Sequence, residues 1–439
     1  MSLHNLIIII KNFILNKLVF FHGVKSFYLN RKFKNKKKHY FFIKKINEYL
    51  KKNNKKIINL RSNAFGFSLI QIDYIFKYIN YYDLDLNNII FISEKIKNTY
   101  LKKILKDKLK INILEYKNIF NLLVSTFPKK KYFKNSFIVT PADCGNYNHP
   151  SSLKISFTNE EILLGETLLK KLGIQNNKKF AIISYKSATY NNSLMKNNKI
   201  LSTHEISQQY RISSFKNLLK TLNYLEDNDI KPLIFNCLNK EELEFFKKYS
   251  KINDLKSKRE REFLEFYSHY KSYLSICGNS GDQFIPKLFN KKTLFHNSTI
   301  PHSISDGIFL PKKFYDVQNN KILNLQKVMS KKILYYEKSD ISKIFSVPPI
   351  YFRDTKHFEK KNIKILENSE DEILNATKEL VFLINNNNLN LTNDQIIQQN
   401  KIKKIYYDNF YTTEDTLVKK NIGGYISPSF LLSNKDFYI

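Results

Sequence analysis

Short apolar runs alternate with amphipathic helical patterns along most of this chain, and this alternation restricts the fold more than any other feature. The first series contains an apolar run at Ile57–Leu60, a helical pattern at Ser68–Asn80 and a second apolar run at Ile89–Ile92. Phe180–Ser184 opens a second series, which Pro232–Phe235 continues. Strands that alternate with helices form parallel sheets whose helices cover the two faces. We therefore predict an α/β fold.

The two series lie on either side of about residue 160, which indicates two similar units. A chain of 439 residues is also too long for one typical core. We predict two Rossmann-like lobes that face each other across a cleft, preceded by an apolar and basic helical extension. The predicted divisions are 1–50 for this amphipathic, basic extension, 51–160 for the first lobe, 161–360 for the second lobe and 361–439 for a C-terminal helical segment and tail.

A helix start is predicted where the second unit begins. Thr158 is placed as its N-cap, because Glu161 three residues later completes a capping-box pattern. Gly173 is predicted to end the same helix, since glycine readily adopts the left-handed conformation found at helix ends.

The stretch Leu274–Pro301 has the order strand, small-residue turn, helix, strand. An apolar run, Leu274–Cys277, stops at the turn Gly278-Asn279-Ser280-Gly281, and Thr293–His296 is the second apolar run. The residues that recur at helical spacing in between are Phe284, Ile285, Leu288 and Phe289. At the carboxyl end of a parallel strand, backbone N–H groups and the positive end of a helix bind anionic oxygens. The stretch predicts a binding site for a phosphate or diphosphate; the alternative is an ordinary strand–helix turn.

The formal charge of +34 would ordinarily indicate a nucleic-acid partner. Lysine and asparagine are heavily used, however, while there are only six arginines and no tryptophan, which is typical of AT-rich codon usage. We favour compositional bias, although such a surface would still attract anionic lipid or sugar phosphate. The three cysteines lie far apart, at Cys144, Cys237 and Cys277, so that neither a disulfide framework nor a zinc site is indicated. The simple inference is a reducing cytoplasm.

The N-terminal residues 1–38 combine an apolar segment with a basic cluster. Lys11 and Lys17 interrupt the apolar residues, so no uncharged run approaches the roughly 20 residues that a membrane span needs. The cluster Arg31–Lys38 follows directly. An apolar helix face beside basic residues is how a helix lies on an anionic membrane surface, and the alternative is a helix packed on its own protein. We predict a cytoplasmic protein, peripheral at the inner face of the membrane if the first alternative holds.

Several segments, taken together and in order, resemble bacterial glycosyltransferases associated with surface-polysaccharide synthesis, whose expected fold is the two-lobed GT-B arrangement. No single segment is specific, and the resemblance rests on the ordered set, which spans about residues 57 to 435. The matching segments are Phe157–Glu161 with Gly165 and Leu172–Ile174, then Tyr210–Ser213, Gly278–Gly281 with Pro286 and Phe289–Lys291, Asp306–Lys313, and Ile426–Leu431.

The resemblance implies that the second lobe binds a nucleotide-sugar donor and the first lobe a glycan or lipid-linked acceptor. Negative charge develops on the departing diphosphate and needs cations or aligned N–H groups. Lys186 and Arg211 are the candidate cations, because an arginine in a lysine-rich chain can mark a need for a bidentate fork. The remaining candidates for donor binding are Ser214, Asn279, Ser280, Gly281 and His296. For Arg211 the alternative is a surface arginine, and for His296 a structural role.

An inverting transferase also needs a base near the acceptor hydroxyl. Asp143 and His149 lie in a polar loop of the first lobe and are the candidate catalytic residues, with ordinary turn residues as the alternative. Arg61 and Gly66 are placed on the acceptor side, in the turn after the first strand.

No metal or other cofactor is predicted, and the nucleotide sugar acts as co-substrate. Asp83-Leu84-Asp85 matches the D-x-D of metal-dependent GT-A transferases, but it follows a predicted helix and precedes a strand, so we interpret it as a loop. GT-B enzymes generally need no bound metal. Patterns typical of serine hydrolases, zinc proteases and Walker-type ATPases are absent from the sequence.

The alternative function is a basic-surface binding protein, for nucleic acid or anionic lipid, built on an inactive transferase-like fold. Phe67 stands where such transferases tend to carry a histidine, which keeps this alternative open. A nucleic-acid binder should interleave aromatic and clustered basic residues in a recognisable module, whereas the lysines here are spread along the chain. We therefore expect an enzyme, and nucleic acid as an improbable partner.

Overall fold

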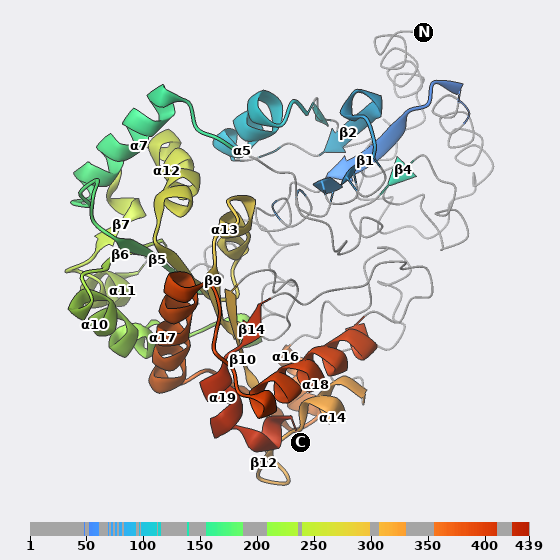
Figure 1. Ribbon diagram of the computed structural model, residues 1–439, viewed down its shortest axis with the longest axis vertical. Coiled ribbons are helices and arrows are strands. Elements are labelled where there is room, and N and C mark those ends of the chain that lie inside the picture. Colours follow the sequence, from blue (N-terminus) through green and yellow to red (C-terminus); the bar gives the residue numbers. More distant parts are fainter. Residues whose placement is uncertain are drawn as a thin grey trace.

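The computed structural model describes two parallel sheets and the helices around them (Figure 1). The described residues are 52–60, 83–93, 98–111, 113–115, 138–139, 155–187, 209–235, 239–298, 307–330, 355–410 and 424–438. Single positions such as 48, 69, 72, 75, 76, 79, 80 and 96 are described in addition. The predicted N-terminal extension lies outside them, apart from Glu48. No helix in the described part of the chain is long and apolar enough to cross a membrane.

The first sheet has four parallel strands in the order β3-β2-β1-β4. Its strands are β1 (Lys56–Leu60), β2 (Ile89–Ser93), β3 (Ile113–Glu115) and β4 (Ile138–Val139). The predicted apolar helix face between β1 and β2 is confirmed at the positions described, which are helical and buried: Leu69, Ile72, Ile75, Phe76 and Ile79. Helix α5 (Thr99–Lys103) continues as a π-helical turn, η2 (Ile104–Lys108), before β3.

The second sheet has seven parallel strands in the order β14-β10-β9-β8-β5-β6-β7. The apolar runs predicted as β5 and β8 form strands with the predicted bounds. The strands are β5 (Phe180–Ser184), β6 (Lys231–Ile234), β7 (Ser250–Lys251), β8 (Leu274–Cys277), β9 (Thr293–Ser298), β10 (Gly307–Pro311) and β14 (Tyr425–Ile426). The α/β fold is thereby confirmed, while the arrangement of two lobes across a cleft and the predicted division of the chain stay predictions.

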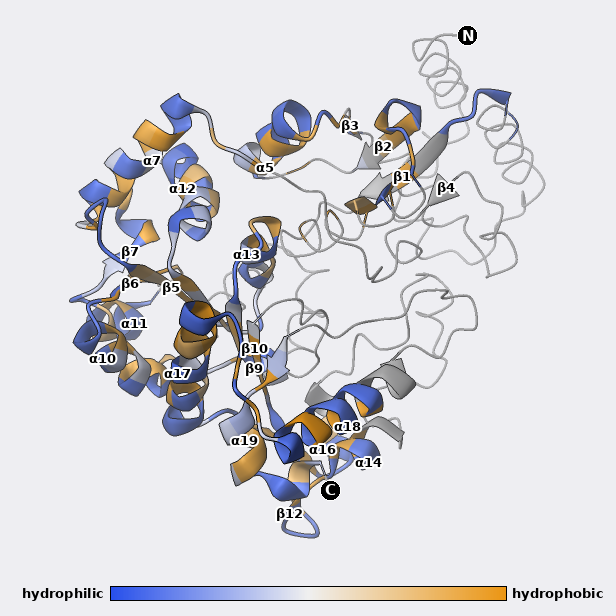
Figure 2. Ribbon diagram, viewed as in Figure 1, coloured by the Kyte–Doolittle hydropathy of each residue, from blue (hydrophilic) through white to orange (hydrophobic). Residues whose placement is uncertain are grey.

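Apolar side chains cover both faces of the second sheet, as the alternation along β5 illustrates. Figure 2 colours the ribbon of β5 as hydrophobic. Phe180 and Ile182 belong to one buried cluster, and Ala181 and Ile183 belong to the other, because successive strand residues point to opposite faces. The helices of the first cluster include α7 (Asn159–Lys171), α12 (Lys258–Lys271) and α13 (Ile285–Leu288), and those of the second include α10 (Leu219–Asp227) and α17 (Glu370–Asn386).

Helix α7 begins as predicted and is fastened to α5 through one carboxylate. Thr158 and Glu161 form the capping box, and Gly173 follows the helix with a φ of 72°. The carboxylate of Glu161 also accepts hydrogen bonds from Lys103 Nζ at 2.9 Å and Lys108 Nζ at 2.6 Å. Because α7 packs beside α12 over the second sheet, this contact connects the two α/β series.

The part of the chain after β10 adds a small antiparallel sheet, β12-β11-β13, and the helices α14, α16, α18 and α19. Their bounds are β11 (Lys313–Asp316), β12 (Lys321–Ile322), β13 (Ile363–Leu366), α14 (Leu325–Ser330), α16 (Thr355–Lys360), α18 (Asn393–Phe410) and α19 (Pro428–Ser433). The segment predicted as a C-terminal helical tail thus also supplies β14 to the large sheet. Gln399 of α18 contacts β14 through both amide atoms: Nε2 donates to the Ile426 oxygen at 2.6 Å, and Oε1 accepts from the Ile426 N–H at 2.9 Å.

Two predicted helices are shorter than their patterns indicated. After the turn Gly278–Gly281 there is a single 3₁₀ turn, η7 (Gly281–Phe284), followed by the four residues of α13. Of the apolar residues predicted at helical spacing, Phe284, Ile285 and Leu288 are buried and Phe289 is partly buried, but they pack a compact turn and not a long helix. Similarly, the sequence pattern predicts a helix over Glu241–Tyr249, whereas α11 (Lys240–Phe245) ends before Tyr249. The low-complexity run Asn385–Asn388 predicts a surface loop, but it begins as the last turn of α17, and Asn387 leaves the helix with a φ of 57°.

Candidate functional site

The most suitable place for a ligand is the carboxyl end of the second sheet between β5 and β8. The strand order changes direction at this point, because β6 and β7 lie on one side of β5 and β8 to β10 on the other. Open α/β sheets bind ligands in the crevice beyond such a switch point. The segment after β5 contains Lys186, and the segment after β8 is the turn Gly278–Gly281, hereafter the 278–281 turn.

Gly278 allows the 278–281 turn to lie directly against the end of β5. Its N–H donates to the Ser184 oxygen at 2.8 Å. A Cβ atom at Gly278 would lie 2.9 Å from the Cα of Tyr185 and 3.3 Å from the N of Lys186, closer than side chains tolerate. The position therefore requires glycine for close backbone approach.

Arg211 connects the 278–281 turn to a third segment, residues 209–214. Its guanidinium Nη2 donates to the Asn279 oxygen at 3.0 Å. The N–H of Ser213 donates to the Lys186 oxygen at 3.1 Å, so the same segment also lies beside the end of β5. The structure thus brings together three of the predicted donor-binding positions, Lys186, Arg211 and Asn279, from segments far apart in the sequence.

Lys312, which the sequence analysis did not single out, contacts the same segment from β10. Its ammonium donates to the Tyr210 oxygen at 2.9 Å and to the Ile212 oxygen at 2.6 Å. The residue is only 2% exposed. Burial lowers the pKa of Lys312 to about 8, with the charge of Glu367 opposing this shift and that of Arg211 adding to it. Lys312 lies in the matching segment Asp306–Lys313, but nothing distinguished it there from the other lysines of a lysine-rich chain.

His296 lies in β9, and its ring is fully buried against the end of β5. Nε2 donates to the Ser184 oxygen at 3.2 Å, and Nδ1 accepts from Asn297 Nδ2 at 3.2 Å. Burial lowers the pKa of His296 to about 4, so the imidazole is neutral at physiological pH. The described contacts of His296 therefore link the end of β9 to the end of β5.

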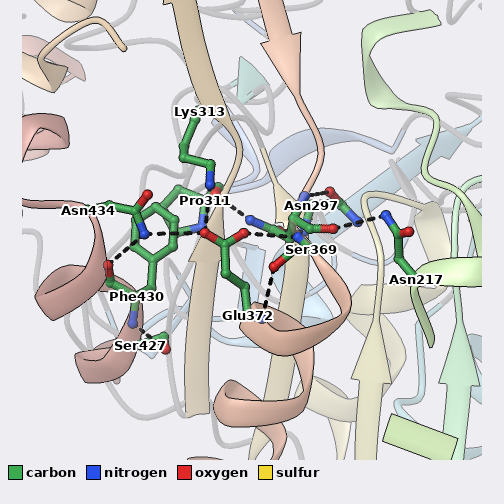
Figure 3. Close-up of polar contacts among 10 residues, drawn as sticks. Asn217, Asn297, Pro311, Lys313, Ser369, Glu372, Ser427, Phe430 and Asn434 are labelled. Atoms are coloured by element: carbon green, nitrogen blue, oxygen red, sulfur yellow. Dashed lines mark hydrogen bonds and ion pairs between the residues drawn. The ribbon is translucent and has the colours of Figure 1, made fainter. Parts of the chain in front are cut away.

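A pair of asparagines holds the segment after β13 against the end of β9 (Figure 3). Asn297 N–H donates to Asn368 Oδ1 at 2.6 Å, and Asn368 N–H donates to Asn297 Oδ1 at 2.7 Å. The neighbouring Glu367 then accepts from the N–H of Ser214 at 2.7 Å. Ser214, another predicted donor-binding residue, is thereby fixed beside Arg211, and its own hydroxyl caps the turn η5 (Phe215–Leu218).

Ser280 and Asp282 form the polar interior of the 278–281 turn. The Ser280 hydroxyl donates to Asp282 Oδ1, and both residues are buried. Burial raises the pKa of Asp282, against the opposing effects of the Ser184 and Ser280 hydroxyls and the positive charge of Lys186. Asp282 was not among the predicted site residues, because a carboxylate one position after a presumed phosphate turn carries no pattern of its own.

Chemically, this edge of the sheet offers cations and a tight backbone turn to an anion. The predicted contribution from a helix dipole fails, because the four residues of α13 are too few to supply one. Among the described residues, the cations at this edge are Lys186, Arg211 and Lys312, and they lie beside the acidic Asp282 and Glu367.

The other predicted site residues cannot be placed. Asp143, His149, Arg61 and Gly66 lie outside the described residues. Asp83-Leu84-Asp85 forms a turn, as expected, and the side chain of Asp85 caps η1 (Leu86–Asn88). Among the residues that the structure describes, no group of three or more His, Cys, Asp or Glu side chains could hold a metal ion.

Comparison with known proteins found no matching family model and no matching curated protein. The solved structures that are similar to this chain include the following two. One is a glycosyl transferase family 9 protein from Veillonella parvula DSM 2008, with 10% identity over 75% of this chain and 97% of that chain and a TM-score of 0.43. The other is ADP-heptose LPS heptosyltransferase II from E. coli, with 10% identity over 55% of this chain and 84% of that chain and a TM-score of 0.30. Neither similarity is strong enough to assign a family.

A partly buried carboxyl group on α12 lies near the 278–281 turn and makes a pH-dependent contribution to stability. Glu265 Oε2 accepts from Asn98 Nδ2 at 3.3 Å. Burial, together with the negative charges of Asp282 and Glu262, raises the pKa of Glu265 to about 8. A carboxyl whose folded pKa exceeds its unfolded value of about 4.3 reduces stability as pH rises between the two values.

We expect Glu265→Gln to be more stable than the parent protein by about 2 kcal/mol at pH 9, because the substitution removes an ionised carboxylate that the fold disfavours. At pH 4.5 the two proteins should be equally stable. Urea unfolding at both pH values measures the difference, with the exposed Glu244→Gln as a control that should show no such trend. Equal stability of Glu265→Gln and the parent at pH 9 would contradict the prediction.

Proposed function

We propose that this protein is a glycosyltransferase that transfers a sugar from a nucleotide-sugar donor to a surface-polysaccharide or other glycan acceptor without a metal ion. The observation that carries the proposal is the meeting of Lys186, Arg211 and the 278–281 turn at the switch point of a seven-stranded parallel sheet. Such a point in an open α/β sheet suits a nucleotide, and the cations suit its diphosphate.

In the proposed reaction the bond between the sugar and the diphosphate breaks, and negative charge accumulates on the leaving group. The guanidinium of Arg211 and the ammonium of Lys186 would stabilise that charge. The neutral, buried His296 would keep the end of β5 in place and would not exchange protons near pH 7. Asp143 and His149 remain the proposed candidates for the base that activates the acceptor hydroxyl.

Titration calorimetry against UDP, ADP, GDP and their sugar conjugates tests the proposal. We expect saturable binding of one nucleotide, and a loss of about 10-fold or more in affinity in Arg211→Met, because a charged hydrogen-bond donor to the ligand is removed. Arg259→Met is the matched control, since Arg259 is an exposed arginine of α12 and its loss changes the net charge equally.

Two results would overturn the proposal. The first is the absence of a calorimetric response to every nucleotide. The second is salt-dependent binding of DNA or anionic vesicles with no nucleotide response, which would favour the alternative of a basic-surface binding protein.

A further inference from the structure

Lys312 carries a buried ammonium group whose position is not explained by an ion pair. Among the described residues no carboxylate forms a salt bridge with it, and the nearby Glu367 bonds the Ser214 N–H instead. The hydrogen-bond partners of the Lys312 ammonium are two backbone oxygens, those of Tyr210 and Ile212. In contrast, the adjacent Lys313 pairs with the carboxylate of Glu372 at 2.7 Å (Figure 3).

Stability alone does not account for this ammonium. Removing a charge from water costs several kcal/mol, and two carbonyl oxygens recover only part of that cost. A methionine of similar length would fill the space without the desolvation cost. The ammonium is therefore expected to have a role in holding a neighbouring segment in place.

The two carbonyl groups that Lys312 binds lie on either side of Arg211. The Tyr210 oxygen belongs to the peptide group before Arg211, and the Ile212 oxygen belongs to the second peptide group after it. Holding the backbone at these two points restricts the direction of the Cα–Cβ bond of Arg211, and hence the region that its side chain can reach. The guanidinium of Arg211 reaches the Asn279 oxygen from this position. Lys312 itself is anchored, since its N–H donates to the Ser298 oxygen at the end of β9 at 2.9 Å. A continuous series of contacts thus runs from β9 through Lys312 and Arg211 to the 278–281 turn.

We propose that Lys312 is a positioning residue, which holds Arg211 against the 278–281 turn so that the guanidinium meets the diphosphate of a bound nucleotide. This inference rests on the proposed function and adds a residue to it. The charged groups that face Lys312 are Arg211 and Glu367, and it also influences His296. An anion beside Arg211 offsets the repulsion between the two cations, so binding of the anion and protonation of Lys312 favour each other.

A double-mutant cycle with the nucleoside diphosphate that binds the parent protein most tightly among UDP, ADP and GDP tests the proposal. At pH 7 we expect Arg211→Met and Lys312→Met each to weaken binding about 10-fold. The double variant should bind no more weakly than Arg211→Met alone, because Lys312 acts through Arg211. Lys313→Met is the matched control and should bind like the parent.

The outcomes separate this inference from the proposed function. Failure of the parent protein to bind any nucleoside diphosphate overturns the proposed function. Binding by the parent with an unaffected Lys312→Met, or with losses that multiply in the double variant, overturns only the role of Lys312.

A second variant covers the case in which Lys312→Met fails to fold. Lys312→Arg keeps the charge at all accessible pH values. We expect the parent protein to lose affinity for the diphosphate as pH rises from 7.5 to 9.5, since a lysine whose pKa is about 8 becomes neutral over this range. In Lys312→Arg the affinity should stay constant over the same range. An identical pH profile for the two proteins would overturn the role of Lys312.

Discussion

Gly307→Ala should destabilise the protein by about 3 kcal/mol or more, the largest effect that we expect from a single methyl group. Gly307 begins β10 with a φ of 146°, a conformation that residues with a side chain rarely adopt. An added Cβ would lie 2.0 Å from the oxygen and 2.6 Å from the N of Thr293, which is its partner in β9. The two strands would have to separate, and neither backbone can move without disrupting its pairing with the neighbouring strand on its other side, β14 for β10 and β8 for β9.

Urea unfolding monitored by circular dichroism measures this effect. Gly173→Ala is the matched control, because Gly173 also has a positive φ, of 72°, but its added Cβ would meet only the flexible end of Lys231. The control should cost about 1 kcal/mol, the usual penalty for a side chain in the left-handed region. Similar losses in the free energy of unfolding for the two variants would show that β9 and β10 can move apart at Gly307.

Glu161→Gln is expected to cost about 3 kcal/mol at pH 7, because the substitution leaves the ammonium of Lys108 without its carboxylate partner. Burial alone would raise the pKa of Glu161, but hydrogen bonds from Lys108 and Lys103 outweigh it and lower the pKa to about 2. A carboxylate with a depressed pKa stabilises the fold above its unfolded value of about 4.3, and this stabilisation is lost as pH falls toward 2.

The difference between Glu161→Gln and the parent protein should therefore be full at pH 7 and fall to roughly a quarter of that value at pH 2.5. Urea unfolding at the two pH values tests this, and the control is Glu160→Gln, the exposed neighbour in the first turn of α7. A deficit that persists unchanged at pH 2.5 would mean that the lost contribution is packing and not charge.

Strands β5 and β8 could be predicted from the sequence because each is a short apolar run buried on both faces. β5 and β8 have the predicted bounds, and the cap at Thr158 follows from a local pattern of four residues. The helix after the 278–281 turn could not be predicted in the same way. Apolar residues at helical spacing are also compatible with a 3₁₀ turn, and which one forms depends on packing against α12.

The site residues differ in the same way: some stand out in the local sequence, and others depend on partners far away in the chain. Arg211 stood out because arginine is rare in this chain, and the structure places it at the predicted turn. Lys312 and the pair Asn297–Asn368 gave no signal. Lys312 contacts a residue 100 positions away, and Asn297 and Asn368 lie 71 positions apart. Parallel sheets bring such distant segments together, and no local sequence pattern predicts these contacts.

The contact between Gln399 and Ile426 has a consequence for the behaviour of the protein at high concentration. Ile426 lies in the outermost strand of the large sheet, where an exposed N–H and C=O could recruit a strand from another molecule. The side-chain amide of Gln399 has a donor and an acceptor spaced as in a peptide group. These two atoms bond the C=O and the N–H of Ile426. A single side chain thus makes the two bonds that a neighbouring strand would make, and because Gln399 and Ile426 are both buried, another molecule could pair with this edge only by displacing α18.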